Sequence, residues 1–389
     1  MKTIGMGGVS YALSSGGMNG ANNPASASFA DSQVDLGVYL FSPDRGAQRS
    51  GNAFGLNGTA NSGDNLFAIP EIGLLYHLND TWSTGLTVYG NGGMNTSYPG
   101  GQIPANTCGL GAPASNLLCG QGKLGVNLNQ VIIAPTLSYK AASNFSVAVA
   151  PQLMVQQFSA SGLQAFSGYS AASGDLTNRG SSYSYGAGLK FGAFWVASPL
   201  VTLGLTYQTE ISASKFSNYA GLFAAPLNVP ANLGFGVALH PSASLTLAAD
   251  FERIFYGDVR AIANQSSSAS PLGTLNGPGF GWSSINVFKV GVSYVVSPRW
   301  TIRAGYNHSD NPISTQNVTF NLLTPAVVQH HASVGATYQL TAKTQMTMAY
   351  NHAFQQTMSG ATSPLLPGGG TDRIRLSEDE VGLAVAYHF

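Results

Sequence analysis

The sequence carries little charge. Of its 389 residues, 16 are Lys or Arg and 16 are Asp or Glu, so the formal net charge is +0 and charged residues make up 8% of the chain. An ordinary soluble protein carries about 25%. So few cations leave no electrostatic footprint for nucleic acid. The hydrophobic fraction of 44% excludes disorder of the kind that combines high net charge with low hydrophobicity.

Long apolar segments are also missing. No run of apolar residues approaches the roughly 18–20 that a membrane-spanning helix needs, and no extended helical periodicity is present. The chain is nevertheless rich in glycine, with 48 residues. A transmembrane β-barrel has this kind of composition, because its strands alternate lipid-facing apolar residues with small or polar residues that face the lumen.

Cysteine is scarce, and both cysteines lie close together. Cys108 and Cys119 stand in a stretch rich in Gly, Pro and Asn, over residues 104–122. Two neighbouring cysteines suit a disulfide in an oxidising compartment, and the alternative is two unpaired loop thiols. No His or further Cys lies nearby, so we expect no zinc site and, more generally, no metal and no cofactor.

Period-2 alternation runs through nearly the whole chain. Leu233, Phe235 and Val237, for example, alternate with Gly234 and Gly236, as in a strand whose two faces meet different surroundings. We expect strands near residues 34–42, 66–78, 82–94, 125–140, 144–157, 183–197, 200–209, 230–240, 244–256, 284–296, 299–308, 329–340, 343–356 and 376–389.

The connections between these segments alternate between short turns and long loops rich in Gly, Ser, Asn and Pro. Outer-membrane barrels have this arrangement, with short periplasmic turns and long extracellular loops. In lipid the sheet must also close, because open edges leave backbone groups unpaired. We therefore predict an all-β fold, a transmembrane antiparallel barrel of about 14 strands over residues 33–389, in the bacterial outer membrane. Residues 1–8 show no apolar core of a signal peptide, so this interpretation expects the leader to have been removed.

The first 32 residues do not read as a strand. The segment Ser14–Ala25 consists of small and turn-forming residues, and it either hangs free or folds into the lumen. A barrel of about 14 strands has a lumen wide enough to leak unless something fills it. We therefore expect residues 1–32 to form a hatch that plugs the barrel.

Several segments carry a resemblance to a known family. Asn23-Pro24-Ala25 lies in the glycine-rich N-terminal segment, and further matching stretches are residues 287–294, 300–306 and 320–328 and the terminal Phe389. Together with the strand pattern, these residues resemble the FadL/TodX-like outer-membrane transporters of long-chain fatty acids and hydrocarbons. The resemblance implies a 14-stranded barrel with an N-terminal hatch that includes Asn23, Pro24 and Ala25. It also implies passive uptake: capture at extracellular loops, transfer to a lumenal pocket, and sideways release at a kinked third strand.

The third predicted strand contains a glycine cluster. Gly90, Asn91, Gly92 and Gly93 follow its apolar part, and glycines inside a strand usually mark a bulge or bend. We expect a kink there that opens the wall sideways. The alternative is that these residues begin the next loop.

Capture and recognition have separate candidates. Apolar residues of two long loops are candidates for extracellular capture, although they would equally well pack the loops against each other: Leu163, Phe166, Tyr169, Phe216, Tyr219, Leu222 and Phe223. By strand parity Lys289 and Arg303 face inward, where each either meets a ligand carboxylate or pairs with Asp250 or Glu252. With so few cations, a neutral hydrocarbon is a serious alternative to a fatty acid.

Other polar residues suggest structural roles. Glu378, Asp379 and Glu380 come at the start of the last predicted strand, where we expect a solvated rim. The adjacent His330 and His331 should point to opposite faces of their strand.

The predicted function is passive uptake of a hydrophobic small molecule by a monomeric barrel surrounded by outer-membrane lipid and lipopolysaccharide. Catalysis is not expected, since the sequence has no Gly-x-Ser-x-Gly elbow and no phosphate-binding loop in its proper context. The alternatives are a transporter of aromatic or alkane hydrocarbons only, and a barrel with a lipase-like or adhesive role.

Overall fold

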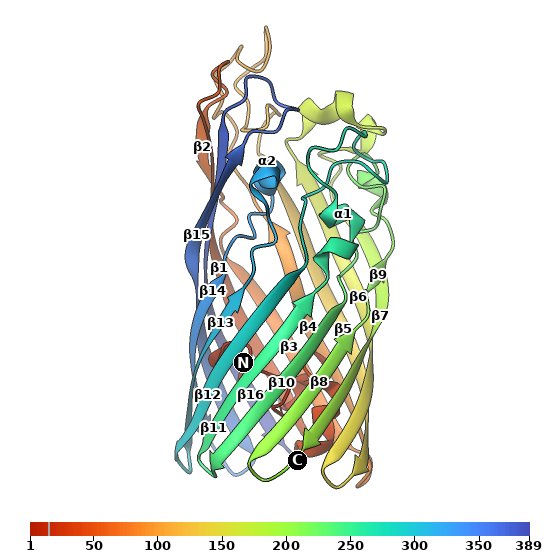
Figure 1. Ribbon diagram of the computed structural model, residues 1–389, viewed down its shortest axis with the longest axis vertical. Helices are drawn as coiled ribbons and strands as arrows, with labels where there is room; N and C mark the ends of the chain where they lie inside the picture. The colour runs from red at the N-terminus through yellow and green to blue at the C-terminus, as the bar shows by residue number, and fades with distance from the viewer. Residues whose placement is uncertain (15) are drawn as a thin grey trace.

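The computed structural model describes residues 1–14 and 16–389, and its main body is a barrel (Figure 1). Fourteen long strands form the wall. They are β1 (Gln33–Ser50), β3 (Phe67–His77), β4 (Trp82–Asn95), β5 (Gly125–Ala142), β6 (Phe145–Ser161), β7 (Ser182–Val196), β8 (Val201–Gln208), β10 (Asn232–Ser242), β11 (Leu245–Ile254), β12 (Ile285–Ser297), β13 (Trp300–Ser309), β14 (His330–Gln339), β15 (Thr344–Ala361) and β16 (Thr371–His388).

All neighbouring strands of the wall pair antiparallel, and the sheet closes on itself. β16 pairs with β1 from Gln33 opposite His388 to Ser50 opposite Thr371, so the first and last strands close the barrel, as a sheet in lipid requires. The short strands β2 (Gly58–Asn61) and β9 (Ser212–Ala213) attach to β1 and β7. The prediction of a closed barrel of about 14 strands is confirmed.

The two faces of each strand meet different surroundings. In β1 the side chains of Leu36, Val38 and Leu40 are 42–55% exposed on the outside, whereas those of Gln33 and Asp35 are buried inside. This alternation makes the outer wall apolar, as lipid requires. Within the described part of the chain, no helix is long and apolar enough to cross a membrane.

The two ends of the barrel differ in their connections. Short turns close one end, while long loops rise from the other and fold over its mouth (Figure 1). The long loops and the N-terminal segment contain only short helices. These are η1 (Ile4–Met6), η2 (Gly16–Gly20), η3 (Pro24–Phe29), η4 (Gln164–Tyr169), η5 (Ser173–Asp175), η6 (Ser217–Tyr219), η7 (Tyr256–Asp258), α1 (Arg260–Ala263), η8 (Thr315–Asn317) and α2 (Val318–Asn321).

Three strands run at least five residues further towards the loops than predicted. β1 extends to Ser50, β15 to Ala361, and β16 begins at Thr371. The expectation that Glu378 and Glu380 lie on a solvated rim is therefore wrong. Both lie within β16 on its inward face. Where a strand projects beyond the membrane it keeps its hydrogen-bonded pairing but no longer alternates apolar with polar residues, so the sequence pattern does not reveal its full length.

The N-terminal hatch lies in the lumen, where inward-facing glycines of the wall make room for it. A Cβ atom at Gly305 would overlap the backbone of Met6 and Gly7, and one at Gly204 would overlap the carbonyl of Tyr11. Wall side chains then satisfy the hatch backbone. One carboxylate oxygen of Asp250, for example, accepts hydrogen bonds from the N–H groups of Ser10 (2.7 Å) and Tyr11 (3.1 Å).

The Asn-Pro-Ala segment connects two parts of the hatch with each other and with the barrel wall. Asn23 caps η3, since its side-chain oxygen accepts a hydrogen bond from the Ala25 N–H at 3.1 Å. Its Nδ2 donates to the Tyr11 carbonyl at 2.8 Å and to the Ala193 carbonyl of β7 at 3.0 Å. Pro24 occupies the first helical position, where its missing N–H costs nothing.

Candidate functional site

A cavity of about 850 Å³ lies inside the barrel, between strand residues and loop segments. Aromatic and aliphatic side chains make up much of its lining. They include Tyr39, Phe41, Phe67, Ile69, Met94, Leu128, Ile254, Tyr256, Trp282 and Ile285. A space of this size and composition suits a small apolar molecule.

The wall is incomplete next to this cavity. β3 pairs with β4 only from Ile72 opposite Val88 to His77 opposite Ser83. The rest of β3, from Phe67 to Glu71, pairs only with β1, and β4 beyond Val88 pairs only with β5. Residues from both unpaired segments line the cavity, which therefore reaches the wall at a place where the strands have separated.

The glycine cluster of β4 lies at this separation. The register of β4 against β5 shifts between Gly90 and Gly93, and Gly92 has a φ of +93°, a conformation that glycine adopts most readily. A Cβ atom at Gly90 would come within 2.7 Å of Cγ2 of Ile69 in β3. The side chain of Ile69 thus occupies the space where the two strands part.

Carboxylates dominate the charged lining. Glu252, Asp310, Glu378 and Glu380 all line the cavity, and Arg45 is the one Lys or Arg among the lining residues. The Arg45 guanidinium donates to the backbone carbonyls of two other residues, Asp64 (3.0 Å) and Asn95.

A tyrosine beyond the end of β11 adds a hydroxyl to the lining. Burial, together with the nearby Glu252 carboxylate, raises the pKa of Tyr256 to about 12. Its hydroxyl therefore stays protonated at neutral pH and adds no negative charge to the cavity.

The two cations predicted to meet a ligand lie elsewhere. Lys289 Nζ contacts Glu252 Oε2 at 2.8 Å and stands 5.3 Å from the ring centroid of Tyr11 in the hatch. Arg303 donates to the Thr337 hydroxyl at 2.6 Å. Neither residue belongs to the cavity lining. Of the two roles that the sequence left open for Lys289, the structure shows the ion pair.

The loop residues predicted for capture mostly form a core. Leu163, Phe166 and Phe216 are each 3% exposed, because the loops fold over the barrel mouth and bury them against one another. Of the two roles that the sequence left open for these residues, the structure shows packing between the loops. Tyr219 belongs to the same core, whereas Tyr169 is 49% exposed.

A small apolar pocket remains within this loop core. It has a volume of about 50 Å³, and Leu163, Phe166, Leu222 and Phe223 line it together with residues of other loops. Four of the predicted capture residues therefore meet at one place, although most of their surface is covered.

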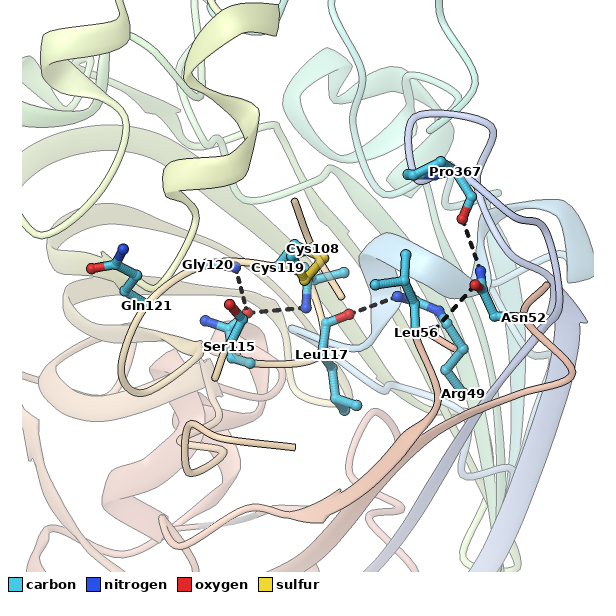
Figure 2. Close-up of a disulfide and its surroundings, with 12 residues drawn as sticks. Arg49, Asn52, Leu56, Cys108, Ser115, Leu117, Cys119, Gly120, Gln121 and Pro367 are labelled. Atoms are coloured by element: carbon cyan, nitrogen blue, oxygen red, sulfur yellow. Dashed lines mark hydrogen bonds between the residues drawn. A yellow bond between two sulfur atoms is a disulfide. The ribbon is translucent and has the colours of Figure 1, made fainter. Parts of the chain in front are cut away.

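The loop region is also held by a disulfide (Figure 2) and by a buried ion pair. Cys108 and Cys119 are bonded, with their Cα atoms 5.6 Å apart. Beside them Arg49 donates to the Leu117 carbonyl at 2.7 Å and to Asp372 at 2.7 Å. The side chains of Arg49 and Asp372 have 0% exposure, so this contact joins β1, β16 and the disulfide loop out of reach of water.

The sequence analysis missed the polar lining of the cavity. Arg45, Glu378 and Glu380 lie on strands that are longer than the sequence pattern predicted. For His331 the pattern predicted only that it and His330 point to opposite faces of their strand. His331 does point inward and lines the cavity. The sequence did contain one signal for this lining: charged residues at inward-facing positions near the loop end of a strand.

Comparison with solved structures shows the same architecture. The chain superimposes on the P. putida toluene transporter TodX with a TM-score of 0.72 and 18% identity, and on the Ralstonia pickettii toluene transporter TbuX with 0.69 and 16%. A Pseudomonas aeruginosa FadL homologue gives 0.69 and 16%. Each match covers 100% of this chain and 97% of the other. At these identities the likeness concerns the fold.

Comparison of the sequence with family models identifies the family and not only the fold. No curated protein matches the chain, but the family model described as outer membrane protein transport protein (OMPP1/FadL/TodX) matches residues 6–365. This match spans the hatch, the kinked strand and nearly all of the wall. The chain therefore belongs to the OMPP1/FadL/TodX family of outer-membrane transport proteins.

Proposed function

We propose that this protein takes up small neutral hydrophobic compounds and releases them sideways into the membrane through the separation between β3 and β4. The observation that carries the proposal is the continuity of the cavity lining with both unpaired strand segments. A solute in the cavity therefore lies against the separation in the wall.

The energetics favour such a path for an apolar solute. Each methylene group kept out of water gains about 0.8 kcal/mol, so a route from an apolar cavity into the lipid core avoids a costly aqueous step. No energy source is needed when the solute moves down its concentration gradient. Two of the related structures are named as toluene transporters, which agrees with a small aromatic solute.

The charges of the lining favour a neutral solute over a fatty acid. A carboxylate in the cavity would face Glu252, Asp310, Glu378 and Glu380, while the one lining cation, Arg45, already binds backbone carbonyls. Like charges inside a protein cavity repel more strongly than they do in bulk water. Lys289 offsets the charge of Glu252, to which it is bound from outside the lining, and within the part of the chain that the structure describes it leaves Asp310, Glu378 and Glu380 without such a partner.

Uptake by intact cells tests this proposal. The protein is produced in a Gram-negative host that lacks other channels of this family, and initial uptake of radiolabelled toluene, benzoate and palmitate is measured. We expect toluene uptake well above the empty host and no gain for benzoate or palmitate. Uptake of palmitate or benzoate at the toluene level would contradict the choice of a neutral solute, and toluene uptake equal to that of the empty host would contradict the proposed function.

A pair of neighbouring variants sharpens the electrostatic argument. Glu380→Gln removes a carboxylate from the lining, and it should raise benzoate uptake several-fold while toluene uptake stays unchanged. Asp379→Asn is the matched control, because Asp379 is the next residue along β16 and faces outward, where it accepts hydrogen bonds from Tyr350 (2.6 Å) and His352 (2.8 Å).

A further inference from the structure

Two polar side chains on neighbouring wall strands face the same part of the cavity. His331 of β14 lies opposite Ala353 of β15, and Ala353 lies opposite Glu378 of β16. The backbones of β14 and β16 are therefore about 10 Å apart at this level, and only the methyl group of Ala353 stands between the two side chains. Both His331 and Glu378 line the cavity.

Neither polar group is matched by the protein around it. The Nδ1 atom of His331 is buried and, among the described residues, has no hydrogen-bond partner. Within the same part of the chain Glu378 takes part in no ion pair, and its neighbour on the inward face of β16, Glu380, accepts from Asn351 at 3.3 Å. A buried polar atom without a partner costs free energy, so the Nδ1 atom of His331 calls for a polar partner, and the Glu378 carboxylate lines the cavity next to it.

The backbone is irregular at the same place. The pairing of β15 with β16 shifts register between Ala353 and Gln356, directly opposite Glu378 and Leu376. A bulge places an extra residue in one strand and re-aims the side chains next to it, and bulges are common beside functional sites. The irregularity thus accompanies the unmatched polar groups and lies on the cavity wall.

We propose that His331 and Glu378 form a polar subsite that binds a hydrogen-bond donor, a hydroxyl or amino group, on an otherwise apolar solute. The inference rests on the proposed function, because it specifies which hydrophobic compounds the cavity selects. The Glu378 carboxylate accepts the donor's hydrogen, and the imidazole of His331 accepts or donates according to its tautomer. The aromatic part of the cavity lining holds the apolar body of the solute.

Isosteric ligands test the subsite. Toluene, phenol and aniline share one ring and differ only in a methyl, hydroxyl or amino group, and their binding to the detergent-solubilised full chain is measured by equilibrium dialysis of radiolabelled compound. The comparison of each ligand between wild type and variant removes the difference in aqueous solubility among the three.

Glu378→Met should weaken phenol and aniline binding by about tenfold, which corresponds to about 1.4 kcal/mol, and leave toluene binding unchanged or tighter. His331→Phe should act in the same direction. Glu378→Gln keeps an acceptor oxygen and should give an intermediate loss. His330→Phe is the matched control for His331→Phe, since His330 is the adjacent residue, faces the opposite side of β14 where it contacts the Tyr306 hydroxyl, and does not line the cavity; it should leave all three ligands unaffected.

The outcomes separate this inference from the proposed function. Loss of affinity for phenol alone assigns the subsite to hydroxyl groups, and loss for aniline alone assigns it to amino groups. If Glu378→Met and His331→Phe weaken toluene as much as phenol and aniline, or weaken none of the three, the subsite is overturned while the cavity's role stands. If wild-type protein does not bind toluene, the proposed function itself fails. Toluene binding also confirms that each variant has folded.

Discussion

The hatch region and the loop region of this barrel fill the same lumen by different means. In the hatch region, backbone lies directly against backbone, because wall glycines such as Gly204 and Gly305 leave no side chain in the way and wall carboxylates such as Asp250 bind hatch N–H groups. In the loop region, apolar side chains from many segments meet, and they leave a cavity of about 850 Å³. Backbone packing leaves little space between hatch and wall, whereas the side chains of the loop region enclose a cavity.

The largest effect should come from disrupting the hatch region. In Gly305→Val the added side chain would overlap Met6 and Gly7, so the hatch should be displaced. We expect ionic conductance across planar bilayers to rise at least tenfold, because an open lumen of about 14 strands admits water and ions. Ala304→Val is the matched control, since Ala304 is the adjacent residue and faces outward. Wild-type conductance in a folded Gly305→Val protein would show that the hatch does not seal by this packing.

A smaller effect is expected from the buried ion pair of the loop region. Asp372→Asn leaves the Arg49 guanidinium buried without its counter-charge, and such a loss typically costs about 3–5 kcal/mol. The free energy of unfolding in detergent, from denaturant titration, measures it.

An exposed ion pair at the same end of the barrel provides the control. Arg375 and Asp44 are 2.7 Å apart, but Asp44 has a side-chain exposure of 62%, so Asp44→Asn should cost at most about 1 kcal/mol. Equal losses for the two variants would mean that burial of the Arg49–Asp372 pair contributes nothing particular to the loop region.

The smallest effect should follow loss of the disulfide. In the chain-entropy model a bond that closes so short a loop contributes about 3 kcal/mol at most, and the loop projects from the barrel. Replacing Cys108 and Cys119 by Ser should therefore speed hydrogen exchange of loop amides near Leu117 and leave the exchange of wall-strand amides unchanged. Faster exchange throughout the wall would show that the disulfide supports the whole barrel.

Much of the fold follows from the sequence, because lipid imposes a strict pattern. Alternation such as Leu233, Phe235 and Val237 against glycines fixes the strand, its face and its approximate ends. The pattern fails where strands leave the membrane, and for this reason Glu378 was assigned to a rim.

The sequence pattern predicted only part of the candidate site. The glycine cluster at residues 90–93 indicated an irregular strand, but the loss of pairing with β3 and the position of Ile69 depend on tertiary register. The sequence left open whether loop residues such as Phe166 and Phe216 capture a ligand or pack the loops against each other, since burial under other loops leaves no periodic signature. Partners of inward cations likewise depend on neighbouring strands, as Lys289 and Glu252 show.

A reversible staple across the wall tests the central claim most directly. Because a Cβ atom at position 90 would lie 2.7 Å from Cγ2 of Ile69, the double variant Ile69→Cys/Gly90→Cys places two thiols within disulfide reach, best in a background where Cys108 and Cys119 are Ser. We predict that the oxidised variant loses toluene uptake, that dithiothreitol restores it, and that Ile69→Cys alone transports normally with or without dithiothreitol. Wild-type uptake through the oxidised, stapled barrel would contradict release between β3 and β4.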